Sequence, residues 1–259
     1  EVPDNWNYVP SFSAKSGPAP DDVASAAKTL ASAERPVIYA GQGVHYAKAW
    51  DELKALAETW NIPVTTSIEG KSAFPENHPL SLGSGGRANS RQVKQYLNDA
   101  DVIFGVGVSF ALTAFGVPMP ANKDGSKTLI HATLDPMDLN KDVPVQHGLI
   151  GDAKLTLQAL SAEMENYSKA PAEKRAGEPE KIAAIRTAWH NEWLPKLTSN
   201  DTPINPYRVI AELDRLVDKD HVVITHDAGS PRDQTTPFWE STAPLSYIGW
   251  GKTTQLGYG

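Results

Sequence analysis

Along residues 21–165, short apolar runs alternate with longer stretches in which apolar residues recur at helical spacing. The apolar runs are nearly continuous, which is typical of strands that are buried on both faces of a parallel sheet. We predict strands at 36–41, 62–67, 101–109, 127–135 and 147–152, and helices from Asp21 or Asp22 to a point before Pro36 and at 49–60, 90–100 and 153–164. The alternation predicts an α/β domain over residues 21–165: a doubly wound, Rossmann-like parallel sheet with helices on both faces.

The last of these helices has a clear start signal. Asp152 directly precedes it, and an aspartate at that position accepts hydrogen bonds from the first free backbone amides of a helix. We therefore predict that Asp152 is the N-cap of the helix at 153–164.

The flanking segments differ in composition from this domain. Residues 1–20 are rich in Pro and Ser and lack periodicity, so we predict an interdomain linker there. Residues 166–205 are polar and rich in helix breakers before a tryptophan-bearing stretch at 182–197. We interpret residues 166–205 as a linker that contains one helix.

Residues 206–259 begin a second α/β unit. A helix is predicted at 207–217 and a strand at 221–229. Too little chain follows to close a sheet with a core of its own, so we expect this unit to be truncated.

Glycine pairs follow two of the predicted strands. Gly41 and Gly43 come after strand 36–41, and Gly105 and Gly107 lie at the end of strand 101–109. Glycine permits a tight turn and a close approach of backbone to phosphate, so each pair is a possible nucleotide site. The alternative is a plain strand-to-helix turn, and the sequence leaves both interpretations open.

Composition narrows the function classes. The net charge is -7 and the 24 Lys and Arg are scattered, so we expect no nucleic-acid partner. No apolar run approaches the roughly 20 residues of a membrane-spanning helix, and we expect no membrane partner and a cytoplasmic location. The chain has no Cys and its 7 His form no His-x-x-x-His pair, so we predict no metal site in this segment.

The pair His226–Asp227 is either catalytic or fixes a loop by hydrogen bonds.

Several stretches, in a fixed order, resemble thiamine-diphosphate-dependent enzymes of the acetolactate synthase and benzoylformate decarboxylase group. They are "ERPVIYAGQGV", "KSAFPENHPLSLG", "ADVIFGVGVSF", "LDP…GLIGDA" and "PINPYRVIAEL…DHVVITHDAG". The resemblance covers nearly the whole chain, and its most specific stretch is "AFPENHPLSLG" at 73–83. It implies that residues 21–165 are the central domain of such an enzyme. Residues 206–259 are then the start of the C-terminal domain that binds thiamine diphosphate.

The resemblance also assigns cofactor-binding residues. The stretch "TQLGYG" at 254–259 falls on the family segment that packs on the thiamine, and Leu256 falls on the large apolar residue that holds the cofactor in its bent shape. Asp227 begins the loop that approaches the diphosphate. The implied cofactor-binding residues are Asp227, Gly229, Ser230, Gln255, Leu256 and Gly257. For Leu256 alone, an ordinary core leucine is the alternative.

This chain departs from the family pattern at two places. Gly229-Ser230-Pro231 stands where acetolactate synthases carry Gly-Gln-His, which weakens an assignment to that enzyme proper. The central domain has "SFALTAF" at 109–115 and Thr133 where flavin-binding members carry their flavin residues, so flavin or ADP in the central domain is disfavoured.

The resemblance implies a larger parent enzyme. The family's activating Glu and its Mg²⁺-binding motif would lie outside this segment, so we expect no catalytic residue within it, weak binding of thiamine diphosphate and no turnover by the segment alone. The parent would make or break a C–C bond next to a carbonyl, as a decarboxylase or carboligase acting on a small 2-oxo acid. It would be a homo-oligomer, a dimer or a tetramer, because active sites in this family form between subunits.

Two other functions stay open. One is a nucleotide-binding or scaffolding α/β module that uses Gly41, Gly43, Gly105 and Gly107. The other is a non-catalytic subunit that a partner chain completes.

Overall fold

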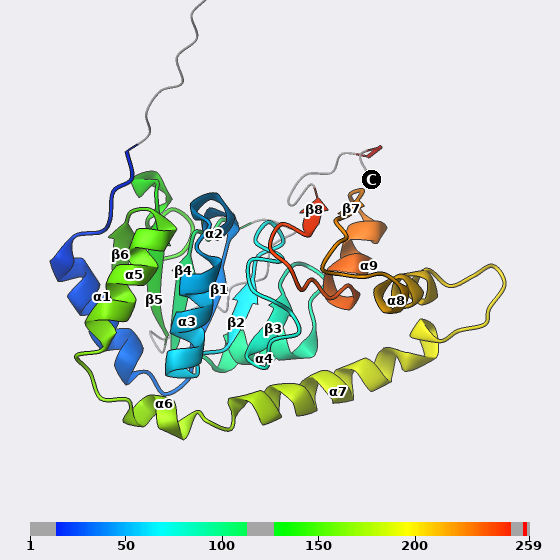
Figure 1. Ribbon diagram of the computed structural model, residues 1–259, viewed down its shortest axis with the longest axis horizontal. Coiled ribbons are helices and arrows are strands. Elements are labelled where there is room, and N and C mark those ends of the chain that lie inside the picture. Colours follow the sequence, from blue (N-terminus) through cyan, green and yellow to red (C-terminus); the bar gives the residue numbers. More distant parts are fainter. Residues whose placement is uncertain (1–13, 113–126, 250–255, 258–259) are drawn as a thin grey trace, which may run out of the picture.

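A six-stranded parallel sheet forms the centre of the molecule, in the strand order β3-β2-β1-β4-β5-β6 (Figure 1). The computed structural model describes residues 14–112, 127–249 and 256–257. The strands are β1 (Pro36–Ala40), β2 (Val64–Thr66), β3 (Ser81–Ser84), β4 (Val102–Val106), β5 (Thr128–Thr133) and β6 (His147–Ile150). The strand order reverses between β1 and β4, so the carboxyl ends of these two strands meet at the topological switch point.

Helices cover both faces of the sheet. On one face lie α1 (Pro20–Ser32), α2 (Gln42–Ala47), α3 (Trp50–Trp60) and α5 (Ala153–Met164); on the other lie α4 (Arg91–Asp99) and α7 (Glu178–Leu197). Each face has its own cluster of buried apolar side chains. Neighbouring residues of β1 serve opposite clusters, since Ile38 belongs to the first and Val37 and Tyr39 to the second. The doubly wound α/β prediction is thereby confirmed.

The predicted strands and helices of the central sheet all form, with shorter bounds in the strands. Asp152 caps α5 as predicted, because its carboxylate accepts hydrogen bonds from the amides of Lys154 at 3.0 Å and Leu155 at 3.2 Å. The edge strand β3 was not predicted, since its sequence "SLGS" contains one large apolar residue, Leu82.

The chain leaves the central sheet through α6 (Ala170–Lys174) and the long helix α7, which runs beneath the sheet toward the C-terminal unit (Figure 1). That unit contains α8 (Pro206–Leu216), β7 (Ile224–His226), α9 (Ser230–Phe238) and β8 (Tyr247–Gly249). β7 and β8 pair in parallel as a two-stranded sheet, and α9 packs against β7 and against the edge strand β3. None of the helices in the described ranges has both the length and the apolarity that a membrane crossing requires.

Candidate functional site

The structure brings together the two segments that the resemblance assigns to thiamine diphosphate. The backbone amide of Gly257 donates a hydrogen bond to Asp227 Oδ2 at 3.1 Å, although the two residues are 30 positions apart. Leu256, next to Gly257, has 76% of its surface exposed, so it is not a core leucine of the described chain. Gln255 lies outside the described residues.

The loop after β7 enters α9 through Gly229. Its φ of +79° is a conformation that glycine adopts without strain, and nothing lies within 4 Å of the position that a Cβ would take. Gly229 and Ser230 are both exposed at the start of the nine-residue α9. The first amides of a helix carry partial positive charge, so an anion can approach the loop at this point.

His226 is held by its surroundings just before this loop. It is 3% exposed, its Nδ1 lies 2.8 Å from Asp227 O, and its ring packs 5.0 Å from that of Tyr247. Burial lowers the pKa of His226, which keeps the ring neutral near pH 7. A Cβ at Gly249 would come within 2.0 Å of His226 Nε2, so the ring fills the space beside β8. This arrangement favours the loop-fixing interpretation of the His226–Asp227 pair.

The four glycines at the switch point pack against protein atoms. The Gly41 amide donates to Val106 O and the Gly43 amide to Gly107 O, both at 2.9 Å. A Cβ at Gly41 would lie 2.3 Å from Gly107 O, and one at Gly105 would lie 2.3 Å from the Phe110 ring. Close packing of the β1 and β4 ends therefore requires glycine without any ligand.

A cavity of about 310 Å³ does open beside these glycines, at the carboxyl ends of the strands. Gly43 and Gly107 line it together with the carboxylates Glu69, Asp135 and Asp138, and no Lys or Arg occurs among the lining residues that the structure describes. Carboxylates repel a nucleotide phosphate, so this lining disfavours a nucleotide. Within the described ranges, no group of three or more His, Asp or Glu is placed to hold a metal ion.

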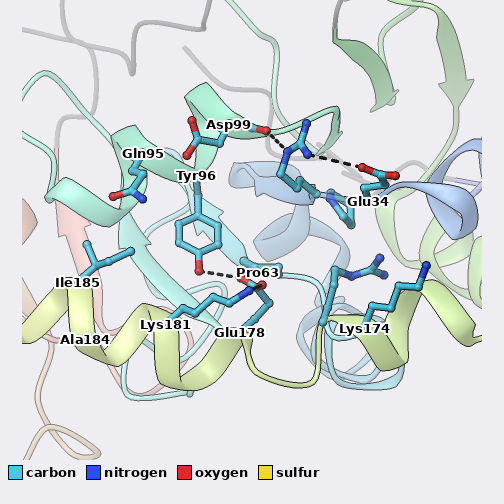
Figure 2. Close-up of a pocket in the computed structure, with 13 residues that line it drawn as sticks. Glu34, Pro63, Gln95, Tyr96, Asp99, Lys174, Glu178, Lys181, Ala184 and Ile185 are labelled. Carbon is cyan, nitrogen blue, oxygen red and sulfur yellow. Dashed lines mark hydrogen bonds and ion pairs between the residues drawn. The ribbon is translucent and has the colours of Figure 1, made fainter.

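A larger groove of about 560 Å³ lies at the opposite end of the sheet, between α4 and the α6–α7 segment (Figure 2). The Tyr96 hydroxyl donates to Glu178 Oε2 at 2.7 Å across it, and burial together with Glu178 raises the pKa of Tyr96 above its ordinary value. Open α/β sheets bind ligands at the carboxyl ends of their strands, whereas this groove lies at the amino ends. We therefore place the candidate site at the Asp227 loop.

The fold is a Rossmann-like α/β domain followed by a smaller unit, in which the structure describes two helices and a two-stranded parallel sheet. The chain belongs to the thiamine pyrophosphate enzyme family: residues 23–160 match the family described as "Thiamine pyrophosphate enzyme, central domain". This match confirms the resemblance that the sequence motifs indicated.

Relatives extend the similarity over almost the whole chain. A probable acetolactate synthase large subunit of Methanococcus aeolicus is 30% identical over 247 residues, which are 93% of this chain and 41% of the relative. A probable acetolactate synthase large subunit of Methanocaldococcus jannaschii is 30% identical over 97% of this chain and 42% of its own length. The acetolactate synthase isozyme 3 large subunit of Escherichia coli is 29% identical over 90% of this chain and 40% of its own length. The chain thus spans about two fifths of the length of these relatives.

Proposed function

We propose that this chain supplies the central domain, residues 21–165, and the first part of the cofactor-binding domain, residues 206–259, of a larger thiamine-diphosphate-dependent enzyme. The parent enzyme makes or breaks a C–C bond next to the carbonyl of a small 2-oxo acid, as a decarboxylase or carboligase. The observation that carries the proposal is the hydrogen bond from the Gly257 amide to Asp227 Oδ2, which joins the two segments that the family resemblance assigns to the cofactor.

The described residues fit the two ends of thiamine diphosphate. The open space at Gly229 and the first turn of α9 suit the diphosphate, and the exposed side chain of Leu256 suits packing against the flat faces of the cofactor rings. When bound, the cofactor supplies an electron sink to the carbon next to a carbonyl. In this proposal Gly229 and Ser230 bind the diphosphate, Leu256 supports the bent cofactor, and Asp227 holds Gly257 in place.

The proposal includes a cation because carboxylates lie close to the proposed diphosphate site. Asp233 in the first turn of α9 is paired with Arg232 at 3.0 Å, whereas Asp227 places a further carboxylate in the loop. A cation would offset the repulsion between Asp227 and a bound diphosphate. Mg²⁺ is the cation that the family resemblance implies, with its motif outside this segment. We assign the activity to the whole enzyme, a cytoplasmic homo-oligomer, and not to this segment alone.

Identification of the native cofactor tests this proposal. The protein is isolated from its source under mild conditions, and the ligand released by acid is oxidised to a fluorescent thiochrome. We expect about one thiamine diphosphate per subunit of the whole parent enzyme, as a specific cofactor site requires. Release of a nucleotide that absorbs at 260 nm, with no thiochrome fluorescence, would contradict the proposal and favour the nucleotide-binding alternative.

A further inference from the structure

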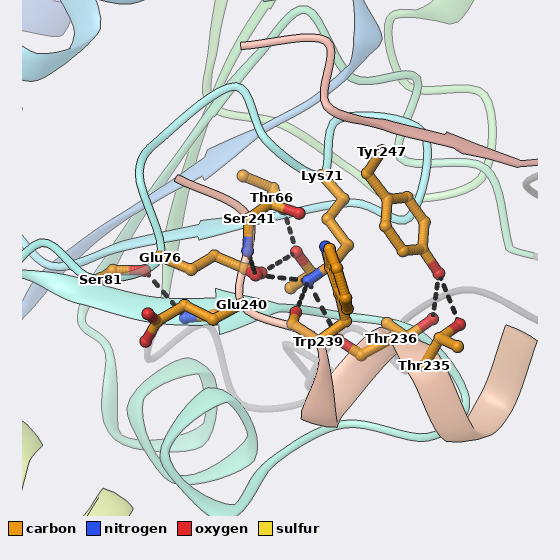
Figure 3. A network of polar contacts seen from close by, with 12 residues as sticks. Thr66, Lys71, Glu76, Ser81, Thr235, Thr236, Trp239, Glu240, Ser241 and Tyr247 are labelled. Atoms are coloured by element: carbon orange, nitrogen blue, oxygen red, sulfur yellow. Dashed lines mark hydrogen bonds and ion pairs between the residues drawn. The ribbon is translucent and has the colours of Figure 1, made fainter. Parts of the chain in front are cut away.

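A buried ion pair in the segment between β2 and β3 makes hydrogen bonds to the C-terminal unit. The Lys71 side chain is 0% exposed and that of Glu76 is 7% exposed, and Lys71 Nζ donates to Glu76 Oε2. Lys71 Nζ also donates to the backbone carbonyls of Thr236 at 3.1 Å and Trp239 at 2.8 Å. An ammonium group has three donors, so these three contacts satisfy Lys71 completely (Figure 3).

The two carbonyls lie at the carboxyl end of α9. Thr236 belongs to the last turn of the helix, and Trp239 directly follows its last residue. Carbonyls at this end have no partner within a helix, and a cation there is favoured by the helix dipole. Lys71 thus caps α9 from the central domain, 165 and 168 positions earlier in the chain.

Glu76 extends the contact beyond the helix. Its Oε2 accepts a hydrogen bond from the Ser241 amide at 2.8 Å, its Oε1 accepts one from Ser84 Oγ at 2.6 Å, and its own amide donates to Ser241 O at 2.8 Å. Ser84 is the last residue of β3, so Glu76 joins the edge of the sheet to the segment that follows α9.

We propose that Lys71 is a positioning residue for the cofactor loop, acting through the ion pair with Glu76 and through α9. This inference rests on the proposed function, because it assigns a role to Gly229 and Ser230 at the amino end of α9. The helix is nine residues long, so its ends are roughly 13 Å apart, and a displacement of its carboxyl end displaces its amino end as well.

The chemistry of the pair also indicates positioning. Apolar residues of similar volume often stabilise a buried site as well as an ion pair does. Stability alone therefore does not explain why charged residues occupy positions 71 and 76. Directional bonds to Thr236 O and Trp239 O, in contrast, determine where α9 ends against β3. An apolar side chain in place of Lys71 offers no such direction.

Hydrogen–deuterium exchange on the whole chain tests the inference. The main variant is Lys71→Met/Glu76→Gln, which removes both charges together and so leaves no buried charge without a partner. The side-chain amide oxygen that this variant carries at position 76 can still accept from the Ser241 amide. The control is Lys154→Met/Glu52→Gln, which likewise removes both charges of an ion pair. That pair joins α5 to α3 at 3.1 Å, away from α9, and its side chains are 39% and 17% exposed.

In the double variant we expect exchange in peptides of α9 and of the 227–230 loop to rise about tenfold or more, as loss of charge-assisted hydrogen bonds implies. Exchange should be unchanged from that of the unsubstituted chain in peptides of β1 and β4. The same holds for all peptides of the control variant. Unchanged exchange in α9, or an equal rise throughout the sheet, would overturn the inference. Should the double variant fail to fold, Lys71→Arg decides: raised exchange confined to α9 supports the inference, and parent-like exchange in α9 contradicts it.

A second arm separates this inference from the proposed function. Millimolar thiamine diphosphate with Mg²⁺ is added to the unsubstituted chain and to the double variant. We expect the ligand to protect the 227–233 peptides from exchange, and to protect them less in the variant. No protection in the unsubstituted chain counts against the proposed function, whereas the role of Lys71 in placing α9 is judged from exchange without ligand. Equal protection in both proteins would contradict a role for Lys71 in placing the cofactor loop.

Discussion

His131 Nε2 lies 2.6 Å from the carbonyl oxygen of Val108, so a side chain of β5 holds the loop that follows β4. A carbonyl only accepts, and Nε2 therefore carries the hydrogen. The other nitrogen, Nδ1, is buried without a hydrogen-bond partner among the described residues. This pattern corresponds to a neutral imidazole, and burial lowers the pKa of His131.

The free energy of unfolding should decrease as the pH falls below about 6.5, the ordinary pKa of histidine. Burial lowers the pKa values of His45, His131 and His226 in the folded state, so the unfolded chain binds more protons in this range. The stabilisation is fully present above the unfolded pKa and is lost as the pH falls toward the folded values, by at most about 1.4 kcal/mol per pH unit for each histidine. Urea unfolding at pH 7.5 and at pH 5.5 measures this decrease in the free energy of unfolding. His131→Asn should reduce this dependence of the free energy of unfolding on pH. An equal pH dependence in that variant would contradict the inference that His131 is neutral in the folded chain.

Substitution of Gly107 by alanine should reduce the free energy of unfolding by about 3 kcal/mol. Gly107 has a φ of +62°, and its Cβ would lie 2.7 Å from the Cα of Gly43. The matched control is Gly177→Ala, where a Cβ meets nothing within 4 Å, and we expect a change within about 0.5 kcal/mol. Urea titration compares the two variants, and equal stabilities would show that the glycine contact at the switch point is absent.

Arg175→Met should destabilise the chain by about 2 kcal/mol or more, because hydrogen bonds from a charged group would be lost. The buried guanidinium of Arg175 donates to Ala33 O at 2.7 Å and to Trp60 O at 2.8 Å, which ties the α6 region to the ends of α1 and α3. Its exposed neighbour provides the control, and Lys174→Met should shift the midpoint of thermal unfolding little. Similar midpoints for both variants would argue against this role of Arg175.

Leu256→Ala should leave the free energy of unfolding within about 0.5 kcal/mol of the parent value, because the side chain is exposed. The same change should weaken binding of thiamine diphosphate, which in our proposal packs on this side chain. Denaturant titration and a binding titration at millimolar cofactor measure the two effects. A loss of about 2–5 kcal/mol in stability, with binding unchanged, is the result expected of a core leucine and would contradict the proposed role.

The central sheet could be predicted because its strands are local apolar runs that need no knowledge of distant residues. β3 and α9 escaped prediction for local reasons: "SLGS" has one large apolar residue, and α9 contains Pro231 in its first turn and Pro237 near its end. The contact of Lys71 with Trp239 spans 168 positions and joins a charged side chain to a backbone carbonyl, so hydrophobic periodicity carries no trace of it. The stretch "KSAFPENHPLSLG" at 71–83 includes both Lys71 and Glu76, but as a family motif it says nothing of their contact with α9.

The central claim is that the Asp227 loop and the Leu256–Gly257 segment form one wall of a thiamine diphosphate site. The most direct test is an amide NMR titration of this chain with millimolar thiamine diphosphate and Mg²⁺, with ADP in a parallel titration. We predict that thiamine diphosphate shifts the amide resonances of Gly229, Ser230 and Gly257 and leaves Gly43 and Gly107 unchanged. Shifts at Gly43 and Gly107 with ADP, and none at Gly229 or Gly257 with thiamine diphosphate, would contradict the claim.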